Sequence, residues 1–400
     1  MVPGAPRVAG VHGGKVGVMG RRKSPTQDFV LAGSDVTRAA AWRSRSDLWH
    51  HFLSAGRSWA IVVRGADILT TGAGNETRAV RVPLASIERA LGGPPGDRVV
   101  FLGADVDEFS VASVSGTTLP DVAAYFAWIA PDQRVLAAAL GSAMGSGGGA
   151  SSAPTGPRRE DATDHTTWQP RRPGRLDDAV TAGRTRDALR EATAGLAGQP
   201  EGDFVPLRTA GEFLGAFDIG LALPAVALAQ WHDSAPFCSS CGAPTAPGEA
   251  GWLRTCTGCG RDHYPRTDPA MIVTVLDDSD RLLLAHASHW PERRYSLLAG
   301  FIEAGEGAEA AVRREVFEET RVSVGEVEYV ASQPWPFPAS LMLAYRARAI
   351  STDIQVDGVE VADARWFSRE DLNAAIRSGE VHLPMGSSIA HALVRRWLDG

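Results

Sequence analysis

The 400-residue chain lacks any apolar run that could cross a lipid bilayer. A spanning helix needs about 18 or more apolar residues, whereas the longest apolar stretch, 219–229, is shorter and contains Pro224. The chain also lacks an excess of positive charge, because its net charge is −7. That balance gives no global attraction to nucleic acid or to an anionic membrane. Residues 1–24 lack the apolar core of a secretory signal. We therefore expect a cytoplasmic protein without a membrane partner.

The chain is too long for one hydrophobic core, since single cores rarely grow past about 250–300 residues. Composition and periodicity divide it into six segments. Residues 141–175 are Gly/Ser-rich and then Pro/Arg-rich, so they bury too little apolar surface to order and should form a flexible linker. The expected segments are a disordered extension at 1–27, a smaller α/β domain at 28–140, the linker at 141–175, a helical connector at 176–235, a cysteine module at 236–265 and a C-terminal domain at 266–400.

Apolar patterning predicts particular elements within these segments. In the first domain we expect strands at 59–65 and 99–105 and helices at 46–56 and 119–130. The connector should contain helices at 176–196 and 221–232. In the last segment we expect strands at 270–277, 281–287, 327–331, 341–350 and 364–367, and helices near 308–320 and at 388–398. This order of elements predicts an α+β fold with a mixed sheet.

The sequence contains few cysteines, and all of them lie in one short module. They form two Cys-x2-Cys pairs, which suit a tetrahedral zinc site with four thiolate ligands. A closed shell of four thiolates leaves no open position for a substrate, so the zinc should be structural. Disulfides are the alternative, and the expected reducing compartment argues against them. The predicted zinc ligands are Cys238, Cys241, Cys256 and Cys259.

The segment that begins at Gly300 is strongly acidic, and the simplest explanation would be a solvated helix face. The helical periodicity argues against that explanation. At about 100° per residue, Val312 and Val316 mark the buried direction, and Glu319 lies only about 20° from Val312. Like charges four residues apart on a buried face are costly. A divalent cation would remove this cost, and carboxylate oxygens favour Mg²⁺ or Mn²⁺.

The spacing of these residues resembles the Nudix box. Gly300 and Glu306 are followed by Arg314-Glu315-Val316-x-Glu318-Glu319 and then by Val322. One position departs from the family pattern, because Arg321 stands where the family has a glycine. That glycine usually ends the helix in a left-handed conformation, so the last helical turn is the least certain part of the box. The resemblance implies an α/β/α Nudix sandwich for the C-terminal domain, which hydrolyses a nucleoside diphosphate derivative.

A second motif, Ser-Gln-Pro-Trp-Pro-Phe-Pro-Ala-Ser, occupies 332–340. Its prolines predict a stiff loop, and Trp335 and Phe337 could stack on a base. From the residues alone, a packed turn is the commoner outcome for such a loop. Together with the Nudix box and the cysteine module, the motif is similar to that of the NADH pyrophosphatase branch, in which the cysteine module is a zinc ribbon. Members of that branch hydrolyse NAD(H) to nicotinamide mononucleotide and AMP, some remove NAD caps from RNA, and they are typically homodimers.

The resemblance also implies roles for individual residues. Glu315 and Glu319 would bind two or three catalytic Mg²⁺ or Mn²⁺ ions, with the Ala299 carbonyl and Glu360 completing the site. Glu318 belongs to the same acid pair, and the proton acceptor stays open among the helix acids. One structural Zn²⁺ is expected per subunit. The implied substrate-binding residues are Tyr264, Phe301, Gln333, Pro334, Trp335, Pro336, Phe337, Pro338, Ala339, Ser340 and Ala390. The acid that the branch carries before Trp252 is replaced here by Gly251.

Two alternatives stay open. The chain could be an RNA-binding protein that grips RNA with its ribbon and the arginine-rich linker. It could also be a Nudix hydrolase that acts on another nucleoside diphosphate derivative, or one that prefers NAD-capped RNA to free NADH.

Overall fold

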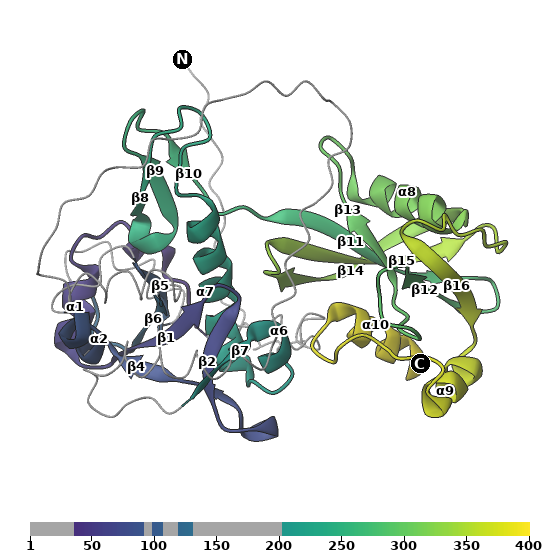
Figure 1. Cartoon of the computed structure of the whole chain (residues 1–400), viewed down its shortest axis with the longest axis horizontal. Helices are drawn as coiled ribbons and strands as arrows, with labels where there is room; N and C mark the ends of the chain where they lie inside the picture. The colour runs from purple at the N-terminus through teal and green to yellow at the C-terminus, as the bar shows by residue number, and fades with distance from the viewer. Residues whose placement is uncertain (1–35, 92–97, 107–118, 131–201) are drawn as a thin grey trace, which may run out of the picture.

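The computed structural model describes residues 36–91, 98–106, 119–130 and 202–400. Within these residues the strands form three separate sheets of seven, three and six strands (Figure 1). The expectations for 1–27, for the linker at 141–175 and for the helix at 176–196 lie outside the described residues. No helix in the described part of the chain is long and apolar enough to span a membrane.

The first sheet has the order β3-β2-β1-β6-β5, with β4 paired to β1 and β7 paired to β2. The predicted strands at 59–65 and 99–105 and the helix at 46–56 are confirmed. The elements of this half are η2 (Ala40–Trp42), α1 (Leu48–Ala55), β1 (Ser58–Arg64), β2 (Asp67–Thr71), η3 (Gly74–Glu76), β3 (Arg78–Ala79), β4 (Arg81–Pro83), α2 (Leu84–Leu91), β5 (Val99–Ala104), β6 (Ala124–Ile129) and β7 (Asp203–Pro206).

The helix predicted at 119–130 is wrong, because this segment contains strand β6 in the interior of the sheet. β6 lies between β1 and β5 and pairs with β1 in parallel. Helices and loops cover both faces of the sheet, so the strand carries a continuous apolar run without alternation, and periodicity cannot distinguish such a run from a buried helix. The aromatic residues Phe126 and Trp128, which are both buried, favour a strand and were the signal that could have decided the question.

Helix α7 (Ala216–Ser234) covers one face of this sheet, beside the short α6 (Leu207–Ala210). It is apolar on nearly all sides and packs Ile219 and Val226 into the cluster that contains Ile61 of β1. The helix predicted at 221–232 is therefore confirmed and extends further in both directions. Because β7 and α7 both contact the N-terminal sheet, residues 203–234 pack as part of that half. The domain boundaries themselves stay a prediction.

The middle module is a small antiparallel sheet of order β10-β9-β8, placed at the end of α7 (Figure 1). It consists of β8 (Thr245–Gly248), η5 (Glu249–Gly251), β9 (Leu253–Cys256) and β10 (Asp262–His263). Two buried side chains join it to α7. Arg254 donates to the Thr245 hydroxyl at 2.7 Å and pairs with His232 of α7 at 2.8 Å.

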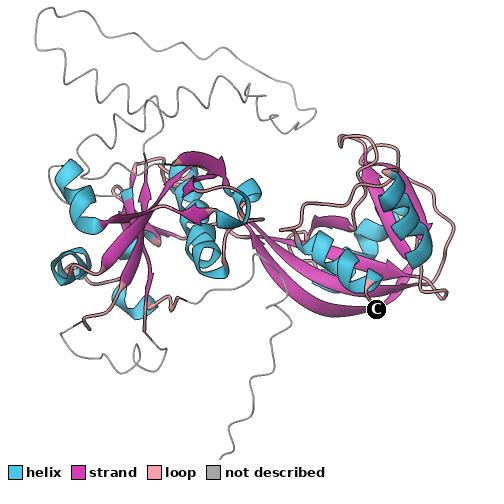
Figure 2. Cartoon of the chain, turned by 90° about the horizontal axis from the view of Figure 1, so that it is seen from below, coloured by secondary structure: helices cyan, strands magenta, loops and turns pink. Residues whose placement is uncertain are grey.

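The C-terminal half is a mixed sheet between two layers of helices (Figure 2). Strands β11 and β15 are parallel, and their other neighbours are antiparallel. Helix α8 covers one face, and α9 and α10 cover the other. The α/β/α sandwich is thus confirmed. Its elements are β11 (Asp268–Leu276), β12 (Leu282–Ala287), β13 (Leu298–Phe301), α8 (Ala308–Thr320), β14 (Val324–Trp335), β15 (Ser340–Ala349), β16 (Val361–Phe367), α9 (Arg369–Ser378) and α10 (Ile389–Leu398).

The loop predicted at 332–340 is shorter than expected. β14 continues to Trp335 and β15 begins at Ser340, so only residues 336–339 form the turn. Pro334 lies inside β14, opposite Leu341. A proline is tolerated there because β14 is the edge strand of the sheet, where a missing N–H breaks no inner ladder.

Helix α8 ends as the family pattern requires, although a glycine is missing. Arg321 takes the left-handed conformation at φ 59°, and its N–H donates to the Phe317 carbonyl at 2.9 Å. This conformation costs a non-glycine residue about 1–2 kcal/mol. The Arg321 guanidinium lies 5.3 Å from the centre of the Phe317 ring, a contact that offsets part of the cost.

We expect Arg321→Gly to stabilise the end of α8 by about 1 kcal/mol, because glycine adopts a positive φ without strain. Hydrogen exchange of the amides in the last turn measures this local stability. Arg313→Gly, within the same helix, is the matched control and should destabilise it by about 1 kcal/mol or more. Faster exchange in Arg321→Gly would contradict the prediction.

Candidate functional site

The site is built on the face of α8 that meets the sheet. Val312 and Val316 are fully buried against β-strands, and Glu319 is only 8% exposed. The helical geometry predicted that this acid points inward, and the prediction is confirmed. A buried carboxylate loses its hydration, so its charge must be compensated locally.

The environment of Glu319 compensates its charge poorly. Burial, followed by the neighbouring charges of Glu315, Glu360 and Asp357, raises the pKa of Glu319 to about 8. One of its carboxylate oxygens, Oε2, is buried without a hydrogen-bond partner. An unsatisfied buried oxygen costs about 1–3 kcal/mol, and more for a charged group. This orphaned oxygen among further carboxylates fits a bound divalent cation.

Gly300 explains how Glu315 reaches the same place. A β-carbon added to Gly300 would lie 2.1 Å from the Glu315 carboxyl carbon, so only glycine lets the carboxylate lie against strand β13. Burial raises the pKa of Glu315, and Arg314 opposes that shift. Gly300 therefore makes room for the Glu315 carboxylate.

Arg314 organises the remaining acids of the box. It holds Glu306 through two bonds of 2.9 Å, and it also donates to Glu315 at 2.9 Å and to Glu318 at 3.2 Å. A further bond of 3.0 Å to the Phe301 carbonyl ties the helix to β13. The bidentate pairing lowers the pKa of Glu306 to about 2. Arg314 is therefore the arginine that orients the carboxylates of the box, whereas Arg313 donates to the carbonyls of Glu309 and Gly325.

The loop before β16 brings one acid that the sequence analysis missed. The Asp357 N–H donates to the Glu319 carbonyl at 3.3 Å, and the Asp357 carboxylate accepts from the N–H groups of Glu360 and Val361 at 3.1 and 2.9 Å. Asp357 therefore fixes the turn that presents Glu360 and adds negative charge near Glu319. The Asp-Gly pair at 357–358 is a turn signal that could have identified it.

The carboxylates are less tightly gathered than the thiolates. Among the described residues, the group whose ligand atoms all lie within 4.8 Å of one another is that of Cys238, Cys241, Cys256 and Cys259. Ala299 of β13 is exposed and faces Ile272 of β11 in register. The roles of Ala299 and of the acids as metal ligands stay predictions.

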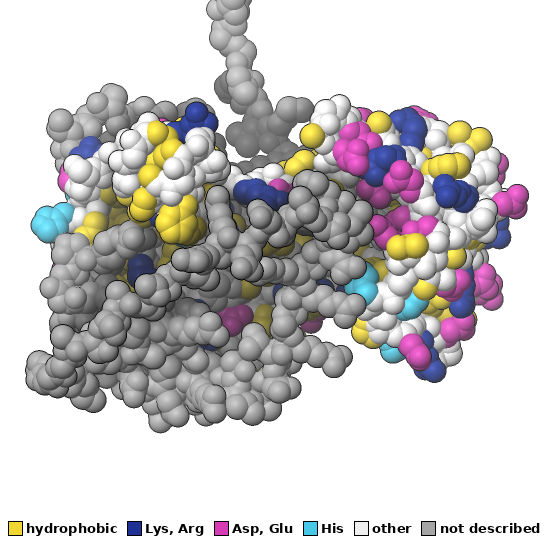
Figure 3. Space-filling view, turned by 45° about the horizontal axis from the view of Figure 1, so that its top comes forward, with side chains coloured by type: hydrophobic (Ala, Val, Ile, Leu, Met, Phe, Trp, Pro, Cys, Tyr) yellow, Lys and Arg dark blue, Asp and Glu magenta, His cyan; other side chains and the backbone are white. Residues whose placement is uncertain are grey.

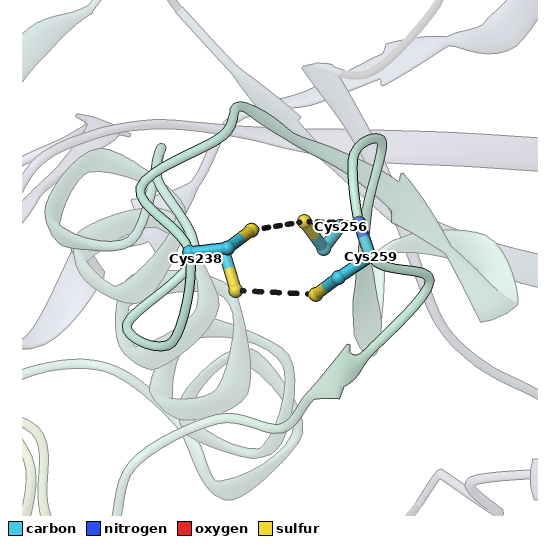
Figure 4. A group of neighbouring side chains, drawn as sticks. Cys238, Cys256 and Cys259 are labelled. Atoms are coloured by element: carbon cyan, nitrogen blue, oxygen red, sulfur yellow. Dashed lines mark hydrogen bonds between the residues drawn. The ribbon is translucent and has the colours of Figure 1, made fainter.

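The four cysteines converge from two turns of the ribbon (Figure 4). All four are free thiols, so the alternative of disulfides is wrong. The Sγ atoms of Cys238 and Cys259 lie 3.8 Å apart, and those of Cys241 and Cys256 lie 3.4 Å apart. A zinc tetrahedron with bonds of about 2.3 Å places its sulfurs about 3.8 Å apart. The cluster therefore suits a structural Zn²⁺.

Backbone N–H groups donate hydrogen bonds to two of these sulfurs and so favour their thiolate forms. Ser240 donates to Cys238, and Gly258 and Cys259 donate to Cys256, at 3.3–3.4 Å. These bonds lower the pKa of Cys238 to about 7 and that of Cys256 to about 6. Thiolates are the form that binds zinc.

Gly251 stands where the related branch carries an acid, and its surroundings explain the replacement. A β-carbon here would lie 2.6 Å from a methyl group of Val100, and its φ of 92° also favours glycine. The Gly251 carbonyl instead bonds His232 at 2.9 Å. This chain therefore uses the position to pack the ribbon on the N-terminal sheet.

The predicted substrate residues fall into two groups. Tyr264 and Phe301 expose 71% and 59% of their surface, so both rings are free to stack on a ligand. Gln333 is fully buried and bonds Ser387 and Ile389 through its amide, which anchors the start of α10 near Ala390. Trp335 and Phe337 lie edge to face at 5.1 Å and pack against the core that contains α7.

Comparisons with known proteins agree with this geometry. The NUDIX domain matches residues 265–385, and the NADH pyrophosphatase zinc ribbon domain matches residues 233–264. The chain is 40% identical over 229 residues to the NAD-capped RNA hydrolase NudC of Mycobacterium bovis. This match covers 54% of this chain and 73% of that protein. It is 41% identical over 193 residues to the NAD-capped RNA hydrolase NUDT12 of Homo sapiens, covering 45% of this chain and 42% of that protein. The chain therefore belongs to the Nudix hydrolase family, in the branch that carries the NADH pyrophosphatase zinc ribbon.

The solved structures that the comparison matches include a Nudix hydrolase from Nitrosomonas europaea. It is 23% identical, with a TM-score of 0.34, and the match covers 41% of this chain and 90% of that one.

We predict that Gly300→Ala displaces the Glu315 carboxylate and weakens Mn²⁺ binding at least about tenfold, because the added methyl would occupy the position of the carboxyl group. Calorimetric titration with Mn²⁺ measures the affinity. Gly307→Ala is the matched control, since its nearest neighbour would be 4.0 Å away and its φ is ordinary. Equal affinities in the two variants would contradict this account of Gly300.

The raised pKa of Glu319 predicts a pH-dependent stability in the absence of added divalent metal. The group has an ordinary pKa of 4.5 in the unfolded chain and about 8 in the folded one. The folded state therefore holds a proton that the unfolded state releases, so stability falls as the pH rises from about 4.5 to about 8. Glu319→Gln removes this loss and should raise the melting temperature more at pH 8 than at pH 5.

The exposed Glu326 supplies the control, because Glu326→Gln should leave the melting temperature unchanged at both pH values. No chelator is added, so that the ribbon retains its zinc. A shift in Glu319→Gln that is equal at both pH values would show that the carboxylate is not protonated in the folded protein.

Proposed function

We propose that the chain hydrolyses the diphosphate bond of NAD(H) to nicotinamide mononucleotide and AMP in a metal-dependent reaction, and that it also removes NAD caps from RNA. The observation that carries this proposal is the buried Glu319, whose partnerless oxygen faces a group of acids in a Nudix box. The zinc ribbon and the relatives named as NAD-capped RNA hydrolases support the choice of substrate.

The chain's own residues supply the parts that the reaction needs. Glu315, Glu319 and Glu360, with the Ala299 carbonyl, would hold two or three Mg²⁺ or Mn²⁺ ions. Bound ions neutralise the charge of the diphosphate and lower the pKa of a bound water, which makes it a nucleophile at neutral pH. Arg314 keeps Glu315 in place while it also holds Glu306.

Glu318 is a candidate for the proton acceptor. Its side chain is 57% exposed and is held at 3.2 Å by Arg314, so it is accessible to a water molecule near the site. This role belongs to the proposal, together with substrate contacts from Tyr264, Phe301, the segment 333–340 and Ala390. A homodimer, a cytoplasmic location and one Zn²⁺ per subunit complete it.

Incubation with NADH and Mg²⁺ tests the proposal, with the products separated by chromatography. We expect reduced nicotinamide mononucleotide and AMP in equal amounts from the wild-type protein. In Glu319→Gln we expect a rate at least about 100-fold lower, because a buried ligand of the catalytic ions is lost. Glu326→Gln should retain full activity.

Two results would contradict the proposal, namely the absence of both products or equal rates in wild type and Glu319→Gln. Binding of uncapped RNA that falls with salt and survives Glu319→Gln would instead favour the RNA-binding alternative. Hydrolysis rates measured side by side on NADH and on NAD-capped RNA show which of the two substrates is preferred.

A further inference from the structure

The turn between β14 and β15 touches the N-terminal half of the molecule. Figures 1 and 2 show that strands of the C-terminal sheet extend toward α7 and the elements beside it. Trp335 and Phe337 pack against the core cluster that contains Leu223 and Val226 of α7. The guanidinium of Arg208 in α6 lies 5.9 Å from the centre of the Trp335 ring. Two aromatic side chains of the segment assigned to the substrate therefore pack on the N-terminal half.

One polar side chain of α7 fixes the backbone of the same turn. The prolines at 334, 336 and 338 have no N–H group, so the turn can donate few backbone hydrogen bonds of its own. Pro336 is buried, and a buried carbonyl needs a donor. The Pro336 carbonyl accepts from Nε2 of Gln230 at 2.6 Å, and the same nitrogen lies 3.5 Å from the Pro338 carbonyl. The position of the turn therefore depends on α7.

A second side chain of the N-terminal half reaches the other segment assigned to the substrate. Glu212 lies between α6 and α7, and its Oε1 accepts from the Gly386 N–H at 3.0 Å. Gly386 belongs to the loop before α10, and the first turn of that helix contains Ala390. Gln333 ties the same loop to β14. Both segments thus receive a hydrogen bond from the N-terminal half.

We propose that Gln230 and Glu212 are positioning residues, through which the N-terminal half sets the places of the two segments that receive the dinucleotide. The proposal rests on the proposed function, because it takes these segments as part of the substrate site. In the described part of the chain, neither side chain bonds an acid of the Nudix box. The largest group of acidic side chains visible in Figure 3 lies on the C-terminal half, away from this junction. Loss of either bond should therefore weaken substrate binding and leave the metal site intact.

Steady-state kinetics with NADH and Mg²⁺ test the role of Gln230. Gln230→Met keeps the length of the side chain but removes the donor, and it should raise KM about tenfold. The value of kcat should stay within about twofold, because the lost interaction acts on binding and not on the reacting atoms. Gln230→Lys again offers an N–H donor and should keep KM within about threefold of the wild-type value. Gln355→Met makes the same change at an exposed side chain and is the matched control, with wild-type kinetics expected.

Glu212 gives a second test that does not involve Gln230. Glu212→Met removes the acceptor and should raise KM about threefold, a smaller effect because this bond is exposed to water. Glu212→Gln retains an acceptor oxygen and should keep the wild-type KM. A general loss of stability would not distinguish the acceptor-retaining variant in this way. The affinity for Mn²⁺ should be that of the wild type in every variant.

Hydrogen exchange of the amides in 337–340 shows the effect on the turn without any substrate. Exchange should be at least about tenfold faster in Gln230→Met than in the wild type, and unchanged in Gln230→Lys. Failure of the wild-type protein to hydrolyse NADH would contradict the proposed function, whereas the exchange rates would still show whether α7 fixes the turn.

Four results would overturn the proposal. They are wild-type KM in both methionine variants at 212 and 230, equal KM in Gln230→Met and Gln230→Lys, a fall of kcat with KM unchanged, and wild-type exchange of the turn in Gln230→Met.

Discussion

The buried carboxylate of Glu319 is the constraint on which the rest of the catalytic half depends. Helix α8 must present Val312 and Val316 to the sheet, and this orientation necessarily carries Glu319 inward with them. The fold thus buries the Glu319 carboxyl group, and burial disfavours its charged form, which raises its pKa to about 8. Such a group is stable either as a protonated acid or as a ligand of a cation.

The residues around Glu319 are consistent with the second of these states, in which the carboxylate is a ligand of a cation. Because Gly300 of β13 has no side chain, Glu315 of α8 can place its carboxylate against that strand, close to Glu319. Asp357 stabilises the turn that contains Glu360. Arg314 donates to Glu306, Glu315 and Glu318 but has no described bond to Glu319. Among the described residues no arginine pairs with Glu319, whose Oε2 is buried without a partner, as the proposal that this carboxylate binds a metal ion requires.

Much of this arrangement could be predicted from the sequence, for identifiable reasons. Periodicity located α8 and the inward direction of Glu319, and the Cys-x2-Cys spacing located the zinc cluster, because both depend on local geometry. The segment 119–130 could not be assigned in this way, because a strand buried on both faces has the same apolar pattern as a buried helix. The Asp-Gly pair at 357–358 offered a local turn signal, but the position of Asp357 beside Glu319 and the packing of Gly251 against Val100 depend on contacts between segments that are distant in sequence. Arg321 shows that a helix can end in the left-handed conformation without a glycine, and its described contacts are with Phe317 of the same helix.

The most direct test of this account is the proton balance of Mn²⁺ binding. Calorimetric titration at pH 7 in two buffers of different ionisation enthalpy gives the number of protons released per bound ion. Because Glu319 is protonated below about pH 8, the account predicts that binding releases a proton at pH 7, that the release disappears near pH 9, and that Glu319→Gln abolishes it. Mn²⁺ binding to the wild-type protein with no proton release at pH 7 would contradict it.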